Sequence, residues 1–324
     1  MAPLLEVRHL QKYYPVKSGL FKQHKDYVHA VDDVSFMIEK NEVFGLVGES
    51  GCGKTTVGRL ITRLVKATDG EILFDGQDFR ALNKKELREM RRNIQMIFQD
   101  PYGSLNPRMT IRDIIAEPLL KHSICPKHEV DDQVKKLLNV VGLSSREMSK
   151  YPHEFSGGQR QRIVIARALS VQPKLIVCDE PVSALDVSIQ AQILNLMSDI
   201  QQEFGTSYLF IAHGIPVVQH ISSRVAVMYL GKLVEVAPSE EIFLKSLHPY
   251  SKALITAVPI PNPDLRRETQ PIMGELPSLI NVPSGCRFHT RCPYADECCK
   301  TVEPELKEIR PGHFCACHRI DAVK

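Results

Sequence analysis

One stretch of the chain carries residue types that suit the binding of a nucleoside triphosphate. The sequence Gly48-x4-Gly53-Lys54-Thr55 overlaps the end of the short apolar run VFGLVG. Glycines allow backbone N–H groups to turn inward around phosphate oxygens, and the start of a following helix adds positive potential. A lysine at this spacing reaches the β- and γ-phosphates, and the threonine hydroxyl binds Mg²⁺. The pattern therefore predicts a phosphate-binding loop between a strand and a helix.

A second stretch, LIVCDEP at residues 175–181, supplies two adjacent carboxylates. Its apolar residues predict a buried strand whose end exposes Asp179 and Glu180. Asp179 would hold Mg²⁺ through water, and Glu180 would polarise the water that attacks the phosphate. Two acids after a strand are, on their own, more often a solvated strand end. The phosphate-binding loop upstream favours the catalytic interpretation.

The third stretch, FSGGQ at residues 155–159, opens a predicted helix. Ser156 and the two glycines would leave a hydroxyl and free N–H groups at the positive end of that helix, where an anion can bind. A plain helix cap is the alternative, because Ser-Gly-Gly is common in loops. The phosphate-binding loop elsewhere in the chain favours a second anion site here.

The order and spacing of these three stretches resemble the nucleotide-binding subunit of ATP-binding cassette (ABC) transporters. The resemblance implies an ATPase in which two subunits close over two ATP molecules. In that arrangement, Ser156 and Gly158 bind the γ-phosphate held by the opposing subunit. The ATP-binding positions that the resemblance implies in this chain are Gly48, Ser50, Gly51, Gly53, Lys54, Thr55, Thr56, Asp179, Ser156, Gly158 and Gln159.

Further site residues follow from the same resemblance rather than from their own types. Gln99 in MIFQD matches the glutamine that senses Mg²⁺ and water, so Thr55, Asp179 and Gln99 are the expected Mg²⁺ site. His213 in LFIAHG matches the switch histidine that holds the γ-phosphate. The resemblance therefore gives catalytic roles to Glu180, His213 and Gln99, and nucleotide contacts to Gln99 as well.

Two more positions match the family, and two depart from it. Tyr14 in KYYP matches the aromatic residue that stacks on adenine, with Tyr13 as the alternative, and Asp186 in SALD matches the loop that crosses the dimer interface. Gly214 stands where an aspartate usually follows the histidine, and Asn41 stands where a glycine is common. Neither departure removes a phosphate or metal contact, although the first alters hydrogen bonding expected at the dimer interface.

The residue pattern predicts an α/β fold. Expected strands cover residues 4–14, 29–48, 92–100, 174–180, 207–213 and 224–237, with a hairpin at Asp75-Gly76 and helices over 54–65 and much of 110–200. The resemblance implies an ABC-type P-loop ATPase domain over residues 1–247, with a RecA-like core, an antiparallel β subdomain and a helical subdomain at about 100–170. Seven prolines in residues 248–285 argue against long regular elements. Residues 248–324 are therefore expected to form a Pro-rich, Cys-rich C-terminal extension.

Six of the nine cysteines lie between residues 286 and 317. In a reducing cytosol, such crowding indicates metal or cluster binding rather than disulfides. The spacing Cys286-x5-Cys292-x6-Cys299-x17-Cys317 supplies four thiolates, which suffice for a 4Fe-4S cluster or a tetrahedral Zn²⁺. This spacing lacks the paired C-x2-C knuckles of most zinc folds, and similar tails in the family resemble iron–sulfur binders, so the cluster is favoured. Cys298 is an alternative to Cys299, and Cys315 to Cys317.

Three segments narrow the resemblance to ATPases of bacterial and archaeal oligopeptide/dipeptide importers, closest to the F-type dipeptide ATPase. They are QDPYGSLNPRMTI, HPYSKALITAVPIPNP and CRFHTRCPYADEC. The implied partners are a paralogous ATPase in a heterodimer, two transmembrane permease subunits and, indirectly, an external peptide-binding protein. Two alternatives stay open: an importer of another cargo such as nickel–ligand complexes, and a soluble ABC ATPase acting on DNA or ribosomes. The latter proteins usually carry coiled-coil insertions or tandem cassettes, which this sequence lacks.

The bulk properties agree with this interpretation. A formal net charge of +3 over 324 residues does not indicate a nucleic-acid partner. No run approaches the roughly 18 apolar residues of a membrane span, and the first residues lack the pattern of a secretory signal. We therefore expect a peripheral protein at the cytoplasmic face of the cell membrane.

Overall fold

The computed structural model describes residues 2–16, 26–257 and 274–322. These residues belong to two compact units. The first unit comprises Met1–Ile38, Val43–Asp78 and Ala212–Lys324, and the second comprises Glu39–Glu42 and Phe79–Ile211. The expected division at residue 247 falls inside the first unit and stays a prediction. Part of the expected Pro-rich segment, residues 258–273, lies outside the described residues.

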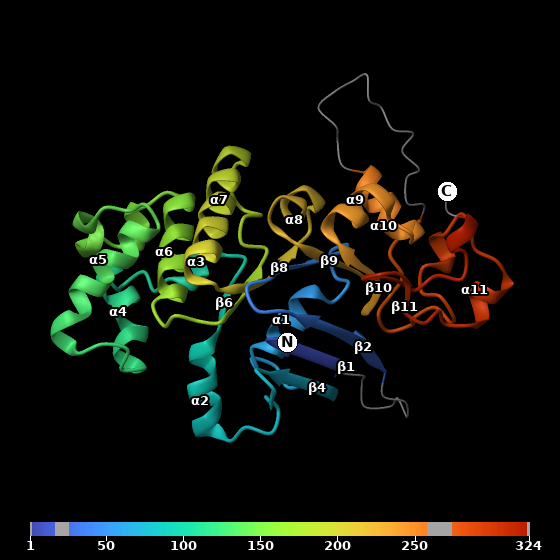
Figure 1. Ribbon diagram of the computed structural model, residues 1–324, viewed down its shortest axis with the longest axis horizontal. Coiled ribbons are helices and arrows are strands. Elements are labelled where there is room, and N and C mark those ends of the chain that lie inside the picture. The colour runs from blue at the N-terminus through green and yellow to red at the C-terminus, as the bar shows by residue number, and fades with distance from the viewer. Residues whose placement is uncertain (1, 17–25, 258–273, 323–324) are drawn as a thin grey trace. The chain divides into compact units, whose positions relative to one another are not determined.

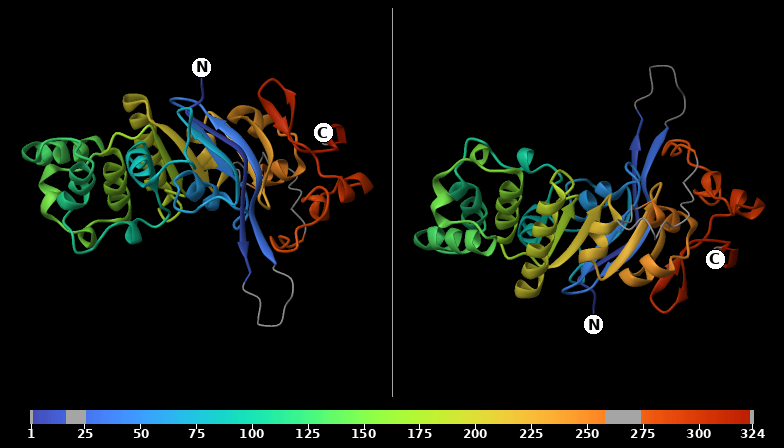
Figure 2. Two further views of the ribbon diagram at one scale, coloured as in Figure 1. Left: turned by 90° about the horizontal axis from the view of Figure 1, so that it is seen from below. Right: turned by 90° about the horizontal axis from the view of Figure 1, so that it is seen from above.

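The first unit contains an antiparallel sheet of four strands. Their order is β2-β1-β4-β5, with β1 at Leu5–Pro15, β2 at Tyr27–Ile38, β4 at Asp69–Phe74 and β5 at Gln77–Asp78. Figure 2 shows β1 and β2 running side by side as a long pair. The hairpin between β4 and β5 turns at Asp75 and Gly76, whose φ angles of 49° and 79° fit a two-residue turn with both central residues left-handed. The predicted hairpin is confirmed.

A second group of strands in the first unit has the order β11-β12-β10-β9-β3. The strands are β3 (Val43–Val47), β9 (Arg224–Tyr229), β10 (Lys232–Pro238), β11 (Lys307–Arg310) and β12 (His313–Cys315). Strand β3 pairs parallel with β9, and the other pairs are antiparallel. All five residues of β3 are buried, as the apolar run predicts. The sequence did not predict strands β11 and β12, which lie within residues 248–324 and continue the sheet beyond β10.

Among the residues that the structure describes, the first unit contains five helices. They are α1 (Lys54–Ile61), α8 (Ile215–Ile221), α9 (Ser239–Lys245), α10 (Pro249–Thr256) and α11 (Glu297–Thr301). Figure 1 shows α9 and α10 beside the β9–β10 hairpin. Phe288, which is 2% exposed, packs its ring against Tyr229 and Tyr250, with centroid distances of 5.3 and 5.4 Å. Burying a side chain of this kind contributes roughly 2–3 kcal/mol, which helps to anchor the residues beyond α10.

A buried carboxylate joins β10 to the segment that follows it. Glu235 is fully buried and accepts hydrogen bonds from the N–H groups of Leu247 and His248, at 2.6 and 3.0 Å. Its other neighbour is His313 of β12, whose Nε2 lies 2.7 Å from Glu235 Oε1. Burial lowers the pKa of His248 to about 4, so this side chain is neutral near pH 7. Removing one partner of such a buried polar group costs roughly 3–5 kcal/mol, so the network fixes β12 and residues 247–248 to β10.

The second unit has three parallel strands in the order β8-β7-β6. Strand β6 covers Ile94–Ile97, β7 covers Leu175–Asp179 and β8 covers Ser207–Ala212. Strands β7 and β8 are buried along their whole length, as their continuous apolar sequences predict. The parallel pairing places the carboxyl end of β7, where Asp179 and Glu180 lie, at one edge of this sheet.

Helices make up most of the rest of the second unit. They are α2 (Lys84–Asn93), α3 (Pro101–Ser104), α4 (Ile111–Lys121), α5 (Val130–Val140), α6 (Gly157–Leu169) and α7 (Val187–Phe204). Figure 1 shows α4, α5 and α6 packed together, with Ile115, Val134 and Val164 among their buried residues. The predicted helical stretch interrupted by β7 is confirmed, whereas α2 was not predicted. Short 3-10 turns in the two units cover Lys127–Glu129, Ser145–Ser149, Pro152–Glu154, His289–Arg291 and Ile320–Ala322.

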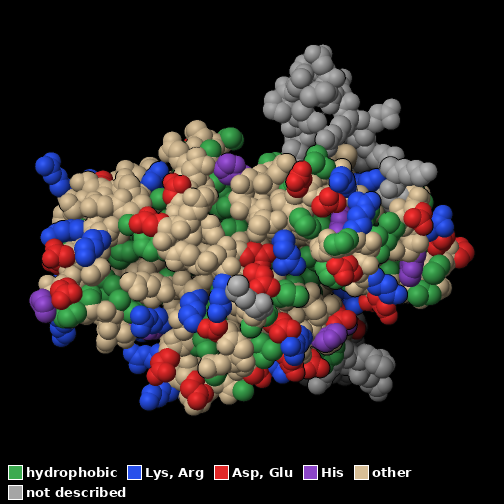
Figure 3. All heavy atoms as spheres, viewed as in Figure 1, with side chains coloured by type: hydrophobic (Ala, Val, Ile, Leu, Met, Phe, Trp, Pro, Cys, Tyr) green, Lys and Arg blue, Asp and Glu red, His purple; other side chains and the backbone are tan. Residues whose placement is uncertain are grey.

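The described surface carries mixed charge. Figure 3 shows acidic and basic side chains interspersed over the face that it draws, in keeping with the small net charge. Within the described ranges, none of the helices has both the length and the apolar character needed to cross a membrane.

Candidate functional site

The predicted phosphate-binding loop lies in the first unit, between β3 and α1. Its conformation depends on glycine at two positions. Gly53 has a φ of 112°, and a Cβ there would lie 2.1 Å from the carbonyl oxygen of Ala30. A Cβ on Gly48 would lie 2.1 Å from the carbonyl oxygen of Met228. Side chains at these positions would clash with backbone, so the glycines let the loop lie close to β2 and β9.

Lys54 and His213 both point to the carbonyl groups at the start of this loop. The Lys54 ammonium donates to the carbonyl oxygens of Gly48 and Glu49, at 2.7 and 2.9 Å, and the side chain is 4% exposed. His213 Nδ1 lies 3.4 Å from the Gly48 oxygen. Thr55 is the second residue of α1, whose first turn carries no acidic residue. The first unit thus brings Lys54, Thr55 and His213 to one loop with a positive helix end.

The second unit brings together Gln99 and Glu180. Gln99 Nε2 donates to Glu180 Oε2 over 2.9 Å. Glu180 has a φ of 49°, a left-handed conformation that is uncommon for a residue other than glycine. Its N–H donates to Ile211 O at 2.9 Å, and Ser183 Oγ donates to its carbonyl at 3.0 Å. The backbone is therefore held in a strained shape that aims the carboxylate at Gln99, a feature common at functional sites.

The segment at Ser156 forms a capping box at the start of α6. Gln159 N–H donates to Ser156 Oγ at 3.4 Å, and Ser156 N–H donates to Gln159 Oε1 at 3.0 Å. A Cβ on Gly158 would lie 2.5 Å from Ile189 Cγ2 in α7, so glycine permits this helix contact. The helix cap that the sequence allows is present, and the binding of an anion by these residues stays a prediction.

The two tyrosines of KYYP have different environments. The Tyr13 hydroxyl donates to Asp32 Oδ1 over 2.5 Å, and its ring lies 4.3 Å from that of His29. Burial would raise the pKa of Asp32, but the Tyr13 hydroxyl and the Arg287 guanidinium outweigh it and lower that pKa. Tyr14 has the Lys12 ammonium 4.8 Å from its ring centroid. Tyr13 is thus fixed by side-chain contacts within its own unit, whereas no hydrogen bond from the described residues holds the Tyr14 hydroxyl.

Asn41 and Gly214, the two residues that depart from the family pattern, can be described by their backbone conformations and hydrogen bonds. Asn41 has a φ of 61°, a conformation that glycine adopts freely and asparagine tolerates better than most residues. Its N–H donates to Ser207 Oγ at 2.9 Å, and its carbonyl accepts from Gln201 Nε2 at 2.6 Å. Gly214 is the N-cap residue of α8 and has an ordinary φ of −88°. The backbone requirement at position 41 explains why asparagine can stand there.

The four cysteines expected to be ligands belong to the first unit, and Cys286 lies close enough to the other three for their thiol groups to interact electrostatically. Burial, together with the nearby thiols of Cys317, Cys299 and Cys292, raises the pKa of Cys286 to about 12. The turn at Gly285 contributes to this grouping, because Cys286 N–H donates to the carbonyl of Cys299 over 2.8 Å. Backbone N–H groups also point at sulfur; that of Arg319 donates to Cys317 Sγ over 3.3 Å.

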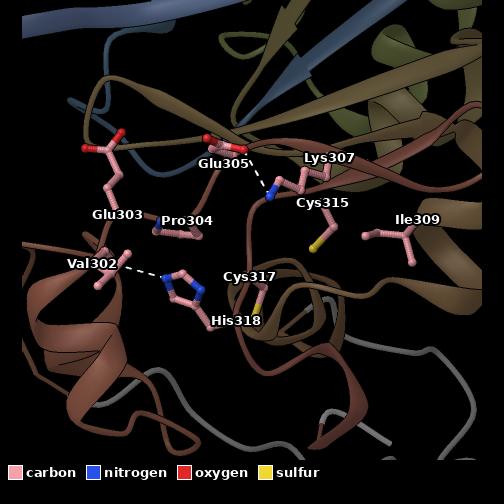
Figure 4. Close-up of a pocket in the computed structure, with 9 residues that line it drawn as sticks. All are labelled: Val302, Glu303, Pro304, Glu305, Lys307, Ile309, Cys315, Cys317 and His318. Carbon is pink, nitrogen blue, oxygen red and sulfur yellow. Dashed lines mark hydrogen bonds and ion pairs between the residues drawn. The ribbon is translucent and has the colours of Figure 1, made fainter.

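The two remaining cysteines of this region differ in exposure. Cys298 is exposed, whereas Cys315 is buried in β12. Cys315 and Cys317 line a cavity of about 270 Å³, drawn in Figure 4. Its other lining residues are Val302, Glu303, Pro304, Glu305, Lys307, Ile309 and His318. Within residues 2–16, 26–257 and 274–322, no three His, Cys, Asp or Glu side chains are arranged to hold a metal ion, so the expected metal site has no direct support from the geometry.

Comparison with solved structures and family models defines the class of protein. The model described as ABC transporter matches residues 31–183. The ATP-binding cassette MJ0796, solved as a dimer bound to ADP and Pi, is 28% identical with a TM-score of 0.64, covering 72% of this chain and 98% of that one. The structure of cbiO1 from Clostridium perfringens, part of the ABC transporter complex cbiONQ, is 25% identical with a TM-score of 0.66, covering 76% and 92%. The fold is that of an ABC-type ATPase.

Sequence relatives narrow the family further. The model described as oligopeptide/dipeptide transporter, C-terminal region, matches residues 234–299. The oligopeptide transport ATP-binding protein AppF of Bacillus subtilis strain 168 is 54% identical over 318 residues, which are 97% of each chain. A protein of Brucella ovis named as a peptide import ATP-binding protein is 52% identical over 317 residues, 98% of each chain. The chain therefore belongs to the ABC transporter ATP-binding protein family that includes these proteins.

Proposed function

We propose that this protein is the ATP-hydrolysing subunit that powers the import of dipeptides or oligopeptides through a membrane ABC transporter. The observation that carries the proposal is the match to peptide-transport ATP-binding proteins over nearly the whole chain, including the C-terminal region that the transporter model describes. The predicted phosphate-binding loop, the Gln99–Glu180 pair and the capped α6 would supply the parts that ATP hydrolysis requires.

The nucleotide would be held mainly by the first unit. The amide groups of the loop and the Lys54 ammonium would bind its phosphates, and Tyr14 would stack on adenine. Tyr14 is favoured over Tyr13 because the Tyr13 hydroxyl already donates to Asp32. The residues proposed to bind phosphate here are Gly48, Ser50, Gly51, Gly53, Lys54, Thr55 and Thr56.

Mg²⁺ would be held by Thr55, Asp179 and Gln99, and it would offset the charge that develops on the transferred phosphoryl group. A hydroxyl, a carboxylate and an amide oxygen are the oxygen donors that Mg²⁺ prefers. Glu180 would accept a proton from the attacking water, while Gln99 holds the carboxylate in place and His213 contacts the γ-phosphate. Ser156, Gly158 and Gln159 would complete the site of a partner subunit.

The partners follow from the proposed transport role. They are a paralogous ATPase that forms a heterodimer with this chain, two transmembrane permease subunits and an external peptide-binding protein that acts indirectly. The protein would lie at the cytoplasmic face of the membrane and depend on the permeases for its attachment. No nucleic-acid partner is proposed.

Transport by the assembled complex tests the proposed function. Proteoliposomes would contain the permease pair, the paralogous ATPase and this chain, with the peptide-binding protein on the outside and ATP inside. We expect uptake of a radiolabelled peptide that depends on ATP and on this chain. A complex that forms and hydrolyses ATP without moving any peptide tested would refute the cargo assignment. Failure to join the permeases, together with ATP hydrolysis stimulated by DNA or ribosomes, would favour the soluble alternative.

We propose further that Cys286, Cys292, Cys299 and Cys317 bind a 4Fe-4S cluster. Support comes from the mutual influence of their thiols on their pKa values and from the Arg319 N–H group that points at sulfur, since such N–H groups stabilise bound thiolate. The exposure of Cys298 favours Cys299 as the third ligand. The cluster would fix the shape of a segment that has few regular elements.

Metal analysis of anaerobically purified protein tests this assignment. Wild type should contain about four iron and four sulfide per chain and absorb broadly near 400 nm. Cys292→Ser should lose most of the iron and the absorbance, whereas the matched control Cys298→Ser should keep both. One zinc per chain and no iron would instead establish the Zn²⁺ alternative. Iron retained by Cys292→Ser and lost by Cys298→Ser would show that the ligand set is wrong.

A further inference from the structure

The phosphate-binding loop contains an acidic residue, Glu49, directly after Gly48. A carboxylate in such a loop repels the phosphates that the loop is proposed to bind, and the repulsion grows as water is excluded. Some other group must therefore offset its charge and direct it away from the nucleotide.

Arg291 contacts this carboxylate through both of its terminal nitrogens. Nη1 donates to Glu49 Oε2 at 2.8 Å and Nη2 donates to Glu49 Oε1 at 3.2 Å. The two side chains are 7% and 22% exposed. Nη1 also lies 3.4 Å from the Tyr229 hydroxyl. A two-point pair between planar groups fixes orientation as well as charge, which a single surface contact does not.

Tyr250 holds the backbone of the same residue. Its hydroxyl accepts a hydrogen bond from Glu49 N–H over 2.8 Å, and the side chain is fully buried. The Glu49 carbonyl accepts from Lys54. The N–H, the carbonyl and the carboxylate of Glu49 are thus all bound, so the loop is attached to α10 through Tyr250 and to the turn His289–Arg291 through Arg291.

Both of these residues lie beyond the part of the chain that the ABC transporter model matches, residues 31–183. Their segment is attached nearby by a second arginine, Arg287, which pairs with Asp32 and donates to Leu230 O. The Arg287 side chain is 9% exposed and that of Asp32 is 14% exposed. Within the first unit, residues 287–291 therefore contact the phosphate loop and β2, through partly buried charged side chains at both places.

We propose that Arg291 and Tyr250 are positioning residues for nucleotide binding. Arg291 offsets the charge of Glu49 and turns its carboxylate away from the phosphates, and Tyr250 fixes the backbone of the loop. The proposal rests on the proposed role of Gly48–Thr55 as the ATP-binding loop. It gives Tyr250 and Arg291, two residues beyond the part that the ABC transporter model matches, a direct part in the affinity for ATP. This part is separate from any role of the nearby cysteines in holding a cluster.

Equilibrium binding of a fluorescent ATP analogue with Mg²⁺ to the purified full chain tests the proposal. Arg291→Gln should weaken binding about tenfold, since it leaves an uncompensated carboxylate beside the phosphates. Glu49→Gln should not weaken binding. The double variant Glu49→Gln/Arg291→Gln should return to within about threefold of wild type, because the need for the cation disappears with the carboxylate. Arg310→Gln, which removes an exposed arginine of β11 paired with Glu241 at 3.6 Å, is the matched control and should bind like wild type.

The recovery in the double variant is the outcome that a merely structural role does not produce. Wild-type affinity in Arg291→Gln would overturn the proposal, and so would a double variant as weak as Arg291→Gln. If Arg291→Gln does not fold, Tyr250→Phe provides the second measurement. That variant should keep the far-UV circular dichroism spectrum of the wild type and bind about threefold more weakly through loss of one hydrogen bond, and unchanged affinity would overturn the role of Tyr250. If wild type itself binds no nucleotide, the proposed function fails instead.

Discussion

Replacing Glu180 with glutamine is expected to lower the kcat of ATP hydrolysis at least about 100-fold, because the carboxylate is the proposed general base. The new side chain keeps the size of the old one, and its amide oxygen is still able to accept the hydrogen bond that Gln99 donates over 2.9 Å. The affinity for ATP should therefore stay within about threefold of wild type. Phosphate release measures the hydrolysis, and equilibrium binding measures the affinity.

Glu203→Gln is the matched control for this experiment. Glu203 is exposed in α7 of the same unit and takes no part in the proposed chemistry, so both kcat and affinity should stay at the wild-type values. A kcat for Glu180→Gln within about tenfold of wild type would mean that another group accepts the proton. Loss of ATP binding by Glu180→Gln would point instead to a role for the carboxylate in holding the nucleotide or its metal.

Glu180 has a left-handed backbone conformation, and replacing its side chain with glutamine should leave that conformation in place. A φ of 49° at a residue with a long side chain persists only where the surroundings hold it. Here Ile211 O and Ser183 Oγ bind the N–H and the carbonyl of Glu180. Since neither bond involves the carboxylate, the substitution leaves the backbone conformation supported, and a change in kcat reports on the chemistry of the side chain.

Strands and turns around the candidate site could be predicted where their conformation depends on a few adjacent residues. The buried strand β3 follows from VFGLVG, and the turn between β4 and β5 follows from Asp75-Gly76, because each depends on a few adjacent residues. Helix α2 was missed because its residues are almost all polar and only Met90 is buried. Its capping box, Asn83 with Glu86, was a signal that could have indicated where it begins.

The short strands β11 and β12 could not have been predicted in this way. Strand β11 is exposed throughout, and β12 has only three residues. What fixes β12 is the contact of His313 with the buried Glu235, which lies 78 residues away in the chain. A contact over that separation leaves no periodic pattern for the sequence to display.

The same limit applies to the candidate site. Motifs predict Lys54 and Glu180, because their spacing from glycines and apolar strands is distinctive, whereas Gln99 is predicted only through the family resemblance. The pair of Arg291 with Glu49 spans 242 residues, and each partner looks ordinary in its own segment. The structure was needed to show that a C-terminal arginine, next to a cysteine, reaches the phosphate loop.

Lys54→Met is expected to lower kcat/KM for ATP at least about 100-fold, because it removes one positively charged donor from the transferring phosphates. Methionine matches the length of the buried lysine chain and keeps its apolar contacts. The carbonyls of Gly48 and Glu49 lose their donor, which costs about 1 kcal/mol of the free energy of unfolding. Steady-state kinetics and thermal unfolding, each with and without MgATP, measure both effects. Lys245→Met is the control, since that lysine is 61% exposed and pairs with Glu241 at 3.1 Å.

The gain in stability that MgATP produces separates the two roles that Lys54 can have. A ligand that binds only the folded protein raises the free energy of unfolding by about 2.7 kcal/mol at 100 times its Kd. Wild type and Lys245→Met should show this gain, and Lys54→Met should show almost none at the same MgATP concentration. A variant with a lower melting temperature that still gains the full stabilisation would show that the ammonium supports the loop through Gly48 and Glu49 without binding phosphate. Because Arg291 and Tyr250 also hold Glu49, the loop should keep its shape in Lys54→Met, and the lost affinity then reports on the missing phosphate contact.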